Sequence, residues 1–221
     1  MPRISRAVAV EYPHHITQRG NYYQSVFDGD EDYIQYLQWL EEYCKKYSLK
    51  IWAYCLMSNH VHFIGVPMRE ESLAKTFNTL HMRYSQYFNQ KRGLKGHLWQ
   101  GRFYSCILDE RHLYAALRYV ENNPCRAGIV ERPWKYKWSS ARTHVYRGEN
   151  HLLSDDCHLT TEIDDWRKYL EGRDEDTVVN TIRQNTKTGR PCGGESFTKM
   201  MEELLGRKLK VLPRGRPFNN K

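Results

Sequence analysis

The chain of 221 residues lacks paired cysteines, long apolar runs and a phosphate-binding glycine loop. Its six cysteines are scattered without a Cys-x-x-Cys pair, which argues against a zinc ribbon and a disulfide framework. No run reaches the roughly 18 apolar residues of a membrane span, and no apolar run after the first residues indicates a signal peptide. We therefore expect a cytoplasmic protein with reduced thiols and no membrane partner.

Acidic residues are missing from one long stretch. Residues 72–108 contain no aspartate or glutamate, in a chain whose net charge is +8. Basic residues in this stretch alternate with aromatic ones, and the basic ones are Lys75, Arg83, Lys91, Arg92, Lys95 and Arg102. Because basic residues neutralise phosphates and exposed aromatics stack on unpaired bases, the stretch predicts a surface that faces nucleic acid. Its aromatics at helical spacing are also typical of a core.

Hydrophobic spacing predicts a regular series of strands and helices. Strands are expected at residues 14–19, 50–57, 60–66 and 98–108, and helices at 28–47, 73–92 and 109–122. The first six elements match the split βαββαβ motif. We expect an α+β fold with a ferredoxin-like βαββαβ core and an antiparallel sheet, extra C-terminal helices and a basic tail.

The chain divides into regions of different composition. We expect a catalytic domain at residues 1–150 and a helical extension at 151–185 that packs on the core. Residues 186–221 form a predicted C-terminal DNA-binding extension, with a polar linker at 186–194 and an amphipathic helix at 195–205. The tail sequence Arg214-Gly215-Arg216-Pro217 resembles an AT-hook core, which places arginines in a narrow minor groove. A disordered solubilising tail is the alternative.

His60 and His62 flank Val61 on a predicted strand. Residues two apart on a strand point to the same face, so both imidazoles can reach one cation while Val61 packs on the other side. A His-x-His pair alone is a weak signal, because two unrelated strand histidines would look the same.

Tyr119 and Asn123 lie four residues apart on the last predicted helix and hence on one face of it. At about 100° per residue they fall at the edge of the apolar stripe, where a side chain can line a cleft. Together with the histidines they suit one reaction. The tyrosine hydroxyl attacks a DNA phosphodiester, a metal polarises a phosphate oxygen, and Asn123 supplies a third, neutral ligand. The bond energy stays in the phosphotyrosine, so the reversal needs no ATP.

Three sequence motifs resemble those of the REP-associated tyrosine transposases, bacterial members of the HUH single-tyrosine transposase superfamily. They are Leu56-Met57-Ser58-Asn59-His60-Val61-His62-Phe63, Gly96-His97-Leu98-Trp99-Gln100-Gly101-Arg102-Phe103 and Tyr119-Val120-Glu121-Asn122-Asn123-Pro124-Cys125-Arg126-Ala127-Gly128. The resemblance implies cleavage of single-stranded DNA beside a palindromic hairpin, through a 5′-phosphotyrosine.

The resemblance also assigns roles to residues. It implies Tyr119 as nucleophile, and His60, His62 and Asn123 as ligands of Mg²⁺ or Mn²⁺, although two imidazoles favour softer metals. It implies a monomer or homodimer in the bacterial cytoplasm, associated with the nucleoid. The predicted DNA contacts are polar or aromatic side chains in or near the motifs and the basic segments: Arg19, Asn59, Arg83, Trp99, Gln100, Arg102, Arg126, Arg190, Arg214 and Arg216.

Two other readings remain open on the sequence. A non-catalytic regulator on the same fold would bind hairpin DNA without cleaving it. A zinc hydrolase would use His60 and His62 with a third ligand such as His97 or His112.

Overall fold

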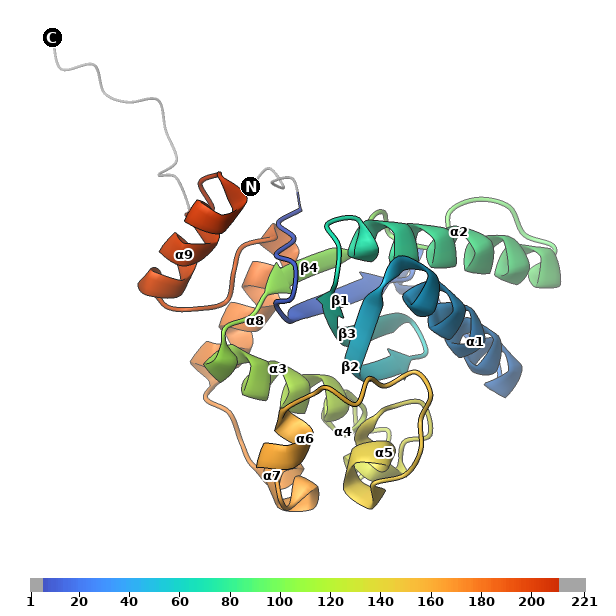
Figure 1. The fold of residues 1–221 in the computed structure, drawn as a ribbon. Helices are drawn as coiled ribbons and strands as arrows, with labels where there is room; N and C mark the ends of the chain where they lie inside the picture. The colour runs from blue at the N-terminus through green and yellow to red at the C-terminus, as the bar shows by residue number, and fades with distance from the viewer. Residues whose placement is uncertain (1–5, 211–221) are drawn as a thin grey trace, which may run out of the picture.

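An antiparallel sheet lies at the centre of the computed structural model, which describes residues 6–210 (Figure 1). Its strands are β1 (His14–Arg19), β2 (Leu49–Met57), β3 (His60–Pro67) and β4 (Tyr104–Ile107), in the order β2-β3-β1-β4. β1 therefore lies between β3 and β4, and Thr17 pairs with His62 and Arg19 with His60. The predicted ferredoxin-like arrangement is confirmed.

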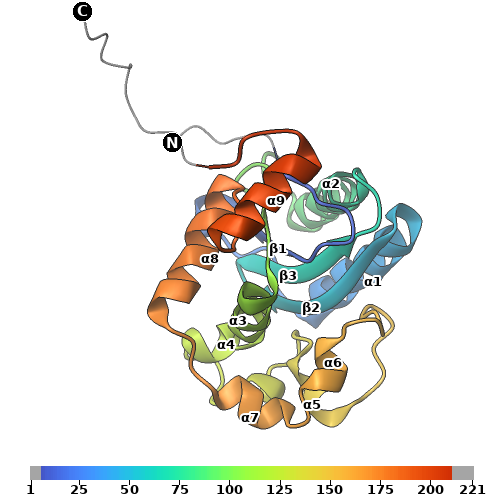
Figure 2. The ribbon, with the colours of Figure 1, turned by 60° about the vertical axis from the view of Figure 1, so that its left-hand side comes forward.

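Two long helices, α1 (Asp30–Tyr47) and α2 (Ser72–Arg92), cover one face of the sheet (Figures 1 and 2). Alternation along β3 directs Val61 and Phe63 to this side, where Tyr36, Phe77 and Tyr84 join them in one buried cluster. The helical spacing of aromatics in the acid-free stretch is thus explained by packing. α2 ends at Gly93, whose φ of +64° is the left-handed conformation that glycine adopts without strain.

The opposite face carries α3 (Glu110–Glu121) and α8 (Asp176–Thr188). The α3 stripe of Leu113, Ala116, Leu117 and Val120 packs on sheet residues such as Ile64. Asp109 caps α3, since its side chain accepts a hydrogen bond from the backbone N–H of His112 at 2.8 Å. The short helix α4 (Asn123–Arg126), with Pro124 in its first turn, follows at once.

Beyond α4 the chain forms short elements that pack around the end of α3. They are the 3-10 helix Pro133–Lys135 and the helices α5 (Ala141–Tyr146), α6 (Leu159–Glu162) and α7 (Trp166–Glu171), with α9 (Glu195–Leu205) following α8. Glu121, which is fully buried, accepts hydrogen bonds from Ser140 Oγ at 2.5 Å, His144 Nδ1 at 2.7 Å and Trp166 Nε1 at 2.9 Å. One buried carboxylate therefore joins the end of α3 to both α5 and α7.

Two boundaries differ from the sequence prediction. The strand expected at 98–108 is regular only from Tyr104 to Ile107, because Gly96 and Gly101 at φ +112° and +122° interrupt the extended backbone before it. The expected linker at 186–194 is packed rather than free. Its first residues end α8, and Cys192 is fully buried and donates its backbone N–H to Ile107 O at 2.7 Å.

No helix within residues 6–210 combines the length and the apolar character needed to cross a membrane.

Candidate functional site

A cavity of ≈ 720 Å³ opens on the α3 and α8 face of the sheet. Three strands (β1, β3 and β4), the loops and the helices α3, α4 and α8 contribute to its lining. The lining residues include His15, Thr17, Arg19, Tyr23, His60, His62, Gln100, Tyr104, Tyr119, Asn123, Arg126, Arg183, Thr186 and Lys187. Strand alternation explains the sheet's share of this set, because His60 and His62 point away from the side of Val61. The lining includes several cationic side chains and no carboxylate.

The two histidines of β3 lie with their rings nearly perpendicular, at a centroid separation of 5.0 Å. His62 is 5% exposed. Burial, and then the charge of Arg19, lowers the pKa of His60 to about 4. Burial, and then the neighbouring His15, lowers the pKa of His62 well below its usual value. Both imidazoles are consequently neutral near pH 7, and the neutral imidazole is the form that ligates metals.

A chain of hydrogen bonds fixes the tautomer of His62. The Thr186 hydroxyl donates to Ile182 O at 2.7 Å, so it accepts from His15 Nδ1 at 2.7 Å. In the neutral form of His15, Nε2 carries a lone pair and accepts from His62 Nδ1 at 2.9 Å. His62 Nε2 is left with its lone pair, as metal ligation requires. On the other side, Asn59 Oδ1 accepts from His60 Nδ1 at 2.6 Å and leaves His60 Nε2 in the same state.

Asn123 lies beside this pair, since its side chain is close enough to His60 to influence the pKa of that imidazole. The Nδ2 of Asn123 is buried without a hydrogen-bond partner. An unpaired buried N–H is costly, and an acceptor such as a phosphate oxygen would satisfy it. Only the amide oxygen of Asn123 could ligate a cation. Two neutral imidazoles and one amide oxygen would suit a divalent transition-metal cation whose remaining ligands are water and phosphate oxygens. Residues 6–210 contain no group of three or more His, Cys, Asp or Glu side chains suited to hold a metal.

Tyr119 projects from α3 onto the histidines. Its ring meets His62 edge-on at 5.6 Å between centroids and His15 at 5.8 Å. Two guanidinium groups lie near the same ring, with the Cζ of Arg126 4.9 Å and the Cζ of Arg183 5.4 Å from the centroid. Burial, and then the charge of Arg183, lowers the pKa of Arg126. Two like charges around a tyrosine make a place where an anion such as a phosphate is favoured.

The structure brings together seven of the side chains singled out in the sequence. Tyr119, His60, His62, Asn123, Arg19, Gln100 and Arg126 all line the cavity. Asn59 lies behind it as the partner of His60, and its Nδ2 donates to Tyr23 O at 3.3 Å.

Other predicted DNA contacts lie elsewhere. Trp99 is only 7% exposed and donates to His81 O within the α1 and α2 core, so the predicted base contact is wrong for this ring. Arg83 packs over Trp39 and pairs with Glu42, on the far face of the sheet. Arg102 and Arg190 do not line the cavity. Arg214 and Arg216 lie outside the described residues.

The acid-free stretch is less cationic in three dimensions than in sequence. Acids from other segments neutralise several of its basic residues, and the pairs are Lys75–Glu71, Arg83–Glu42, Lys91–Asp32 and Arg92–Asp28. The expected continuous phosphate-facing surface along residues 72–108 is therefore wrong for α2. The cationic surface lies instead around the cavity.

Sequence reasoning missed His15, Tyr23, Arg183, Thr186 and Lys187. A strand-period signal was available for His15, which shares one face of β1 with Thr17 and Arg19. No local signal marked α8, because its polar sequence indicates a solvated segment. Neither His97 nor His112 lines the cavity, so neither supplies the third zinc ligand, and His112 Nδ1 is instead bonded to Asp109 at 2.7 Å.

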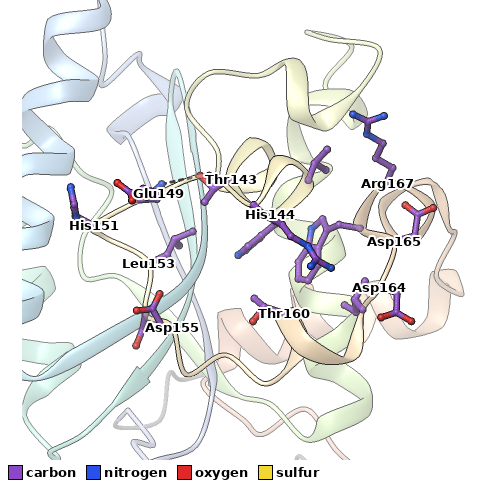
Figure 3. A pocket seen from close by; sticks show the side chains of 17 residues that line it. Thr143, His144, Glu149, His151, Leu153, Asp155, Thr160, Asp164, Asp165 and Arg167 are labelled. Atoms are coloured by element: carbon purple, nitrogen blue, oxygen red, sulfur yellow. Dashed lines mark hydrogen bonds between the residues drawn. The ribbon is translucent and has the colours of Figure 1, made fainter.

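A larger cavity, of ≈ 820 Å³, lies apart from this site between α5, the 147–155 loop and the segment from α6 to α7 (Figure 3). Its lining mixes acidic and basic side chains around His144, such as Glu149, Asp155 and Arg167. His144 is already bonded to Glu121, so this cavity borders the contact that holds α3 in place.

The chain is similar to known proteins in its sequence family and in its fold. The family model described as "Transposase IS200 like" matches residues 9–123, more than half of the chain. A solved structure described as a REP-associated tyrosine transposase bound to a REP hairpin is similar in fold, with a TM-score of 0.54, 19% identity, and coverage of 71% of this chain and 93% of that one. A putative transposase from Deinococcus radiodurans aligns at a TM-score of 0.39 and 16% identity, over 55% of this chain and 97% of its own. No curated protein sequence matches.

Proposed function

The chain belongs to the IS200-like transposase family, and on that premise we propose that it cleaves and rejoins single-stranded DNA beside a palindromic hairpin, with Tyr119 as nucleophile. The observation that carries this proposal is the position of Tyr119, which lines a cationic cavity, meets His62 edge-on and has Arg126 and Arg183 close to its ring. The family match ends at residue 123, so Arg126 and Arg183 both lie beyond the matched region.

The proposed reaction is a transesterification. The Tyr119 oxygen forms a bond to phosphorus as the bond from phosphorus to the 3′ oxygen breaks, and the phenol proton is lost while the leaving oxygen gains one. The product strand ends are a 5′-phosphotyrosine and a free 3′-hydroxyl. Attack by a 3′-hydroxyl on the phosphotyrosine reverses the step with little change in free energy. The Tyr119 hydroxyl has no hydrogen-bond partner among residues 6–210, so it is free to meet the phosphate.

The remaining residues orient and neutralise. Arg126 and Arg183 offset the charge of the phosphate and of the developing transition state. His60, His62 and Asn123 would hold a divalent cation, Mg²⁺ or Mn²⁺, which when bound polarises a phosphate oxygen. Asn59 and the His15–Thr186 pair keep the two imidazoles in the ligating tautomer.

Adduct formation tests the proposal. The protein is incubated with Mn²⁺ and hairpin-bearing single strands from the DNA that flanks its gene, and then run on a denaturing gel. We expect a denaturant-resistant protein–DNA band that is lost with Tyr119→Phe and with EDTA. Equal cleavage by Tyr119→Phe would sink the proposal. Tight hairpin binding without any adduct would favour the regulator, and cleavage with one tight Zn²⁺ and no adduct would favour the zinc hydrolase.

A further inference from the structure

Two consecutive tyrosines between β1 and α1 are exposed and held in an unusual backbone conformation. Tyr22 is 90% exposed and Tyr23 is 64% exposed. Both have positive φ angles, +49° and +60°, in the left-handed region that bulky residues rarely adopt. Such conformations persist only where the surroundings enforce them, and they concentrate at functional positions.

Backbone hydrogen bonds before and after Tyr22 and Tyr23 hold these two residues in the left-handed conformation. Gly20 donates its N–H to Asn59 O at 2.8 Å, and Asn21 donates to Leu98 O at 2.8 Å. On the far side, Val26 donates to Ser58 O at 2.7 Å. A Cβ on Gly20 would lie 2.4 Å from Gln24 O, so this tight turn requires glycine. The loop is thus held in one conformation, in which the rings of Tyr22 and Tyr23 lie outside the core.

This loop borders the cavity that contains Tyr119. Tyr23 lines the same cavity as His60 and Tyr119. The Arg19 guanidinium lies 5.0 Å from the centre of the Tyr23 ring, and Arg19 also lines the cavity. An aromatic ring paired with a cation suits a nucleotide, because the ring can stack on a base while the guanidinium meets the phosphate.

We propose that Tyr23, with Tyr22 beside it, is a stacking platform for an unpaired base next to the scissile phosphate. This rests on the proposed function, since it assumes that single-stranded DNA enters the cavity. The platform takes the role that the sequence suggested for Trp99, whose ring is buried in the core. Stacking tolerates any base, so the platform contributes to affinity for the single strand and not to recognition of the hairpin sequence.

The test is a binding experiment with the chemistry switched off. Tyr119→Phe, in EDTA, is titrated with the flanking-DNA hairpin, intact or with an abasic site at each unpaired position in turn. We expect the abasic site to weaken binding by about tenfold at one or two positions. Adding Tyr23→Ala should weaken binding to intact DNA by a similar factor and remove the abasic effect. Tyr23→Phe should keep it.

Tyr146→Ala is the matched control, because Tyr146 is 56% exposed but lies on α5, away from the cavity. It should bind as the parent does. Thermal unfolding checks that the loop variants fold, and removing an exposed ring from a strained position should not lower the melting temperature. The platform is wrong if no abasic site matters, or if Tyr23→Ala keeps the full abasic effect. If the abasic effect depends on Tyr23 but the wild-type protein forms no adduct with DNA, the stacking platform stands and the proposed nuclease activity is wrong.

Discussion

Tyrosine and histidine lie on both faces of the sheet, but they make different contacts on each face. On the α1 and α2 side, His81 is bonded to the Tyr36 hydroxyl at 3.0 Å, and the Tyr84 hydroxyl donates to Val26 O at 2.6 Å. On the α3 and α8 side, Tyr119 and three histidines line an open cavity, and Asn123 Nδ2 has no hydrogen-bond partner. Polar groups that satisfy one another stabilise a core, whereas polar groups aimed at empty space are arranged for a ligand.

Two tyrosines give the sharpest version of this comparison. Tyr119→Phe should reduce adduct formation by at least about a thousandfold, because the nucleophilic oxygen is gone, and should leave stability unchanged. Tyr84→Phe should keep adduct formation but cost about 1–3 kcal/mol, because the buried Val26 carbonyl loses its partner. Denaturing gels measure the first quantity and urea unfolding the second. The comparison is wrong if Tyr119→Phe lowers the stability while keeping adduct formation, or if Tyr84→Phe abolishes adduct formation while keeping the stability.

Two arginines on opposite faces give a smaller effect. Arg183→Ala should slow adduct formation by about ten- to a hundredfold, since a guanidinium near the nucleophile is lost. Arg83→Ala removes a guanidinium that packs on Trp39 and pairs with Glu42, and it should leave the rate unchanged. Single-turnover rates at saturating DNA decide between them. Equal slowing in both variants would mean that arginine charge acts at a distance and not through the cavity.

Lowering the pH should reduce the stability that the buried His81 contributes. Burial lowers the pKa of His81 to about 3, well below the 6.5 of a free histidine, so the unfolded chain binds a proton that the folded chain excludes. The stability contributed by neutral His81 is complete above pH 6.5 and is lost as the pH falls toward 3.

Between pH 7 and pH 5 the loss should be about 2 kcal/mol. His81→Gln should show a correspondingly flatter dependence of urea unfolding on pH, whereas His97→Gln, at an exposed position, should follow the wild type. An unchanged slope in His81→Gln would mean that His81 binds a proton as readily in the folded state as in the unfolded state.

Patterns along the chain predicted the fold well where periodicity was strong. The strands predicted at 14–19 and 60–66 and the helix predicted at 73–92 agree with the observed elements to within one residue, because alternation and helical spacing follow burial directly. The strand before α3 was overestimated, because apolar residues such as Leu98 and Phe103 are buried in an irregular segment. Buried residues in an irregular segment have no periodic spacing, so the sequence pattern cannot define where the strand begins.

The site was predictable in part for the same reason. His60 and His62, and Tyr119 and Asn123, lie at spacings that place each pair on one side of its element. Arg183 and Thr186 were not predictable, because α8 reaches the cavity through contacts with α3 and β4 that no local pattern encodes. Likewise Trp99 and Arg83 carry the chemistry of DNA contacts, but packing assigns them to the opposite side of the sheet.

The sequence by itself determined the strand and helix order, the face of β3 that carries the histidines, and the family. Those properties follow from local spacing, which constrains backbone periodicity and side-chain direction. Only the tertiary structure decided which cations stay unpaired, which aromatic rings are exposed, and that His15 and Thr186 hold His62 in its ligating tautomer. These depend on distances between segments far apart in the chain, and burial and electrostatics are set by those distances.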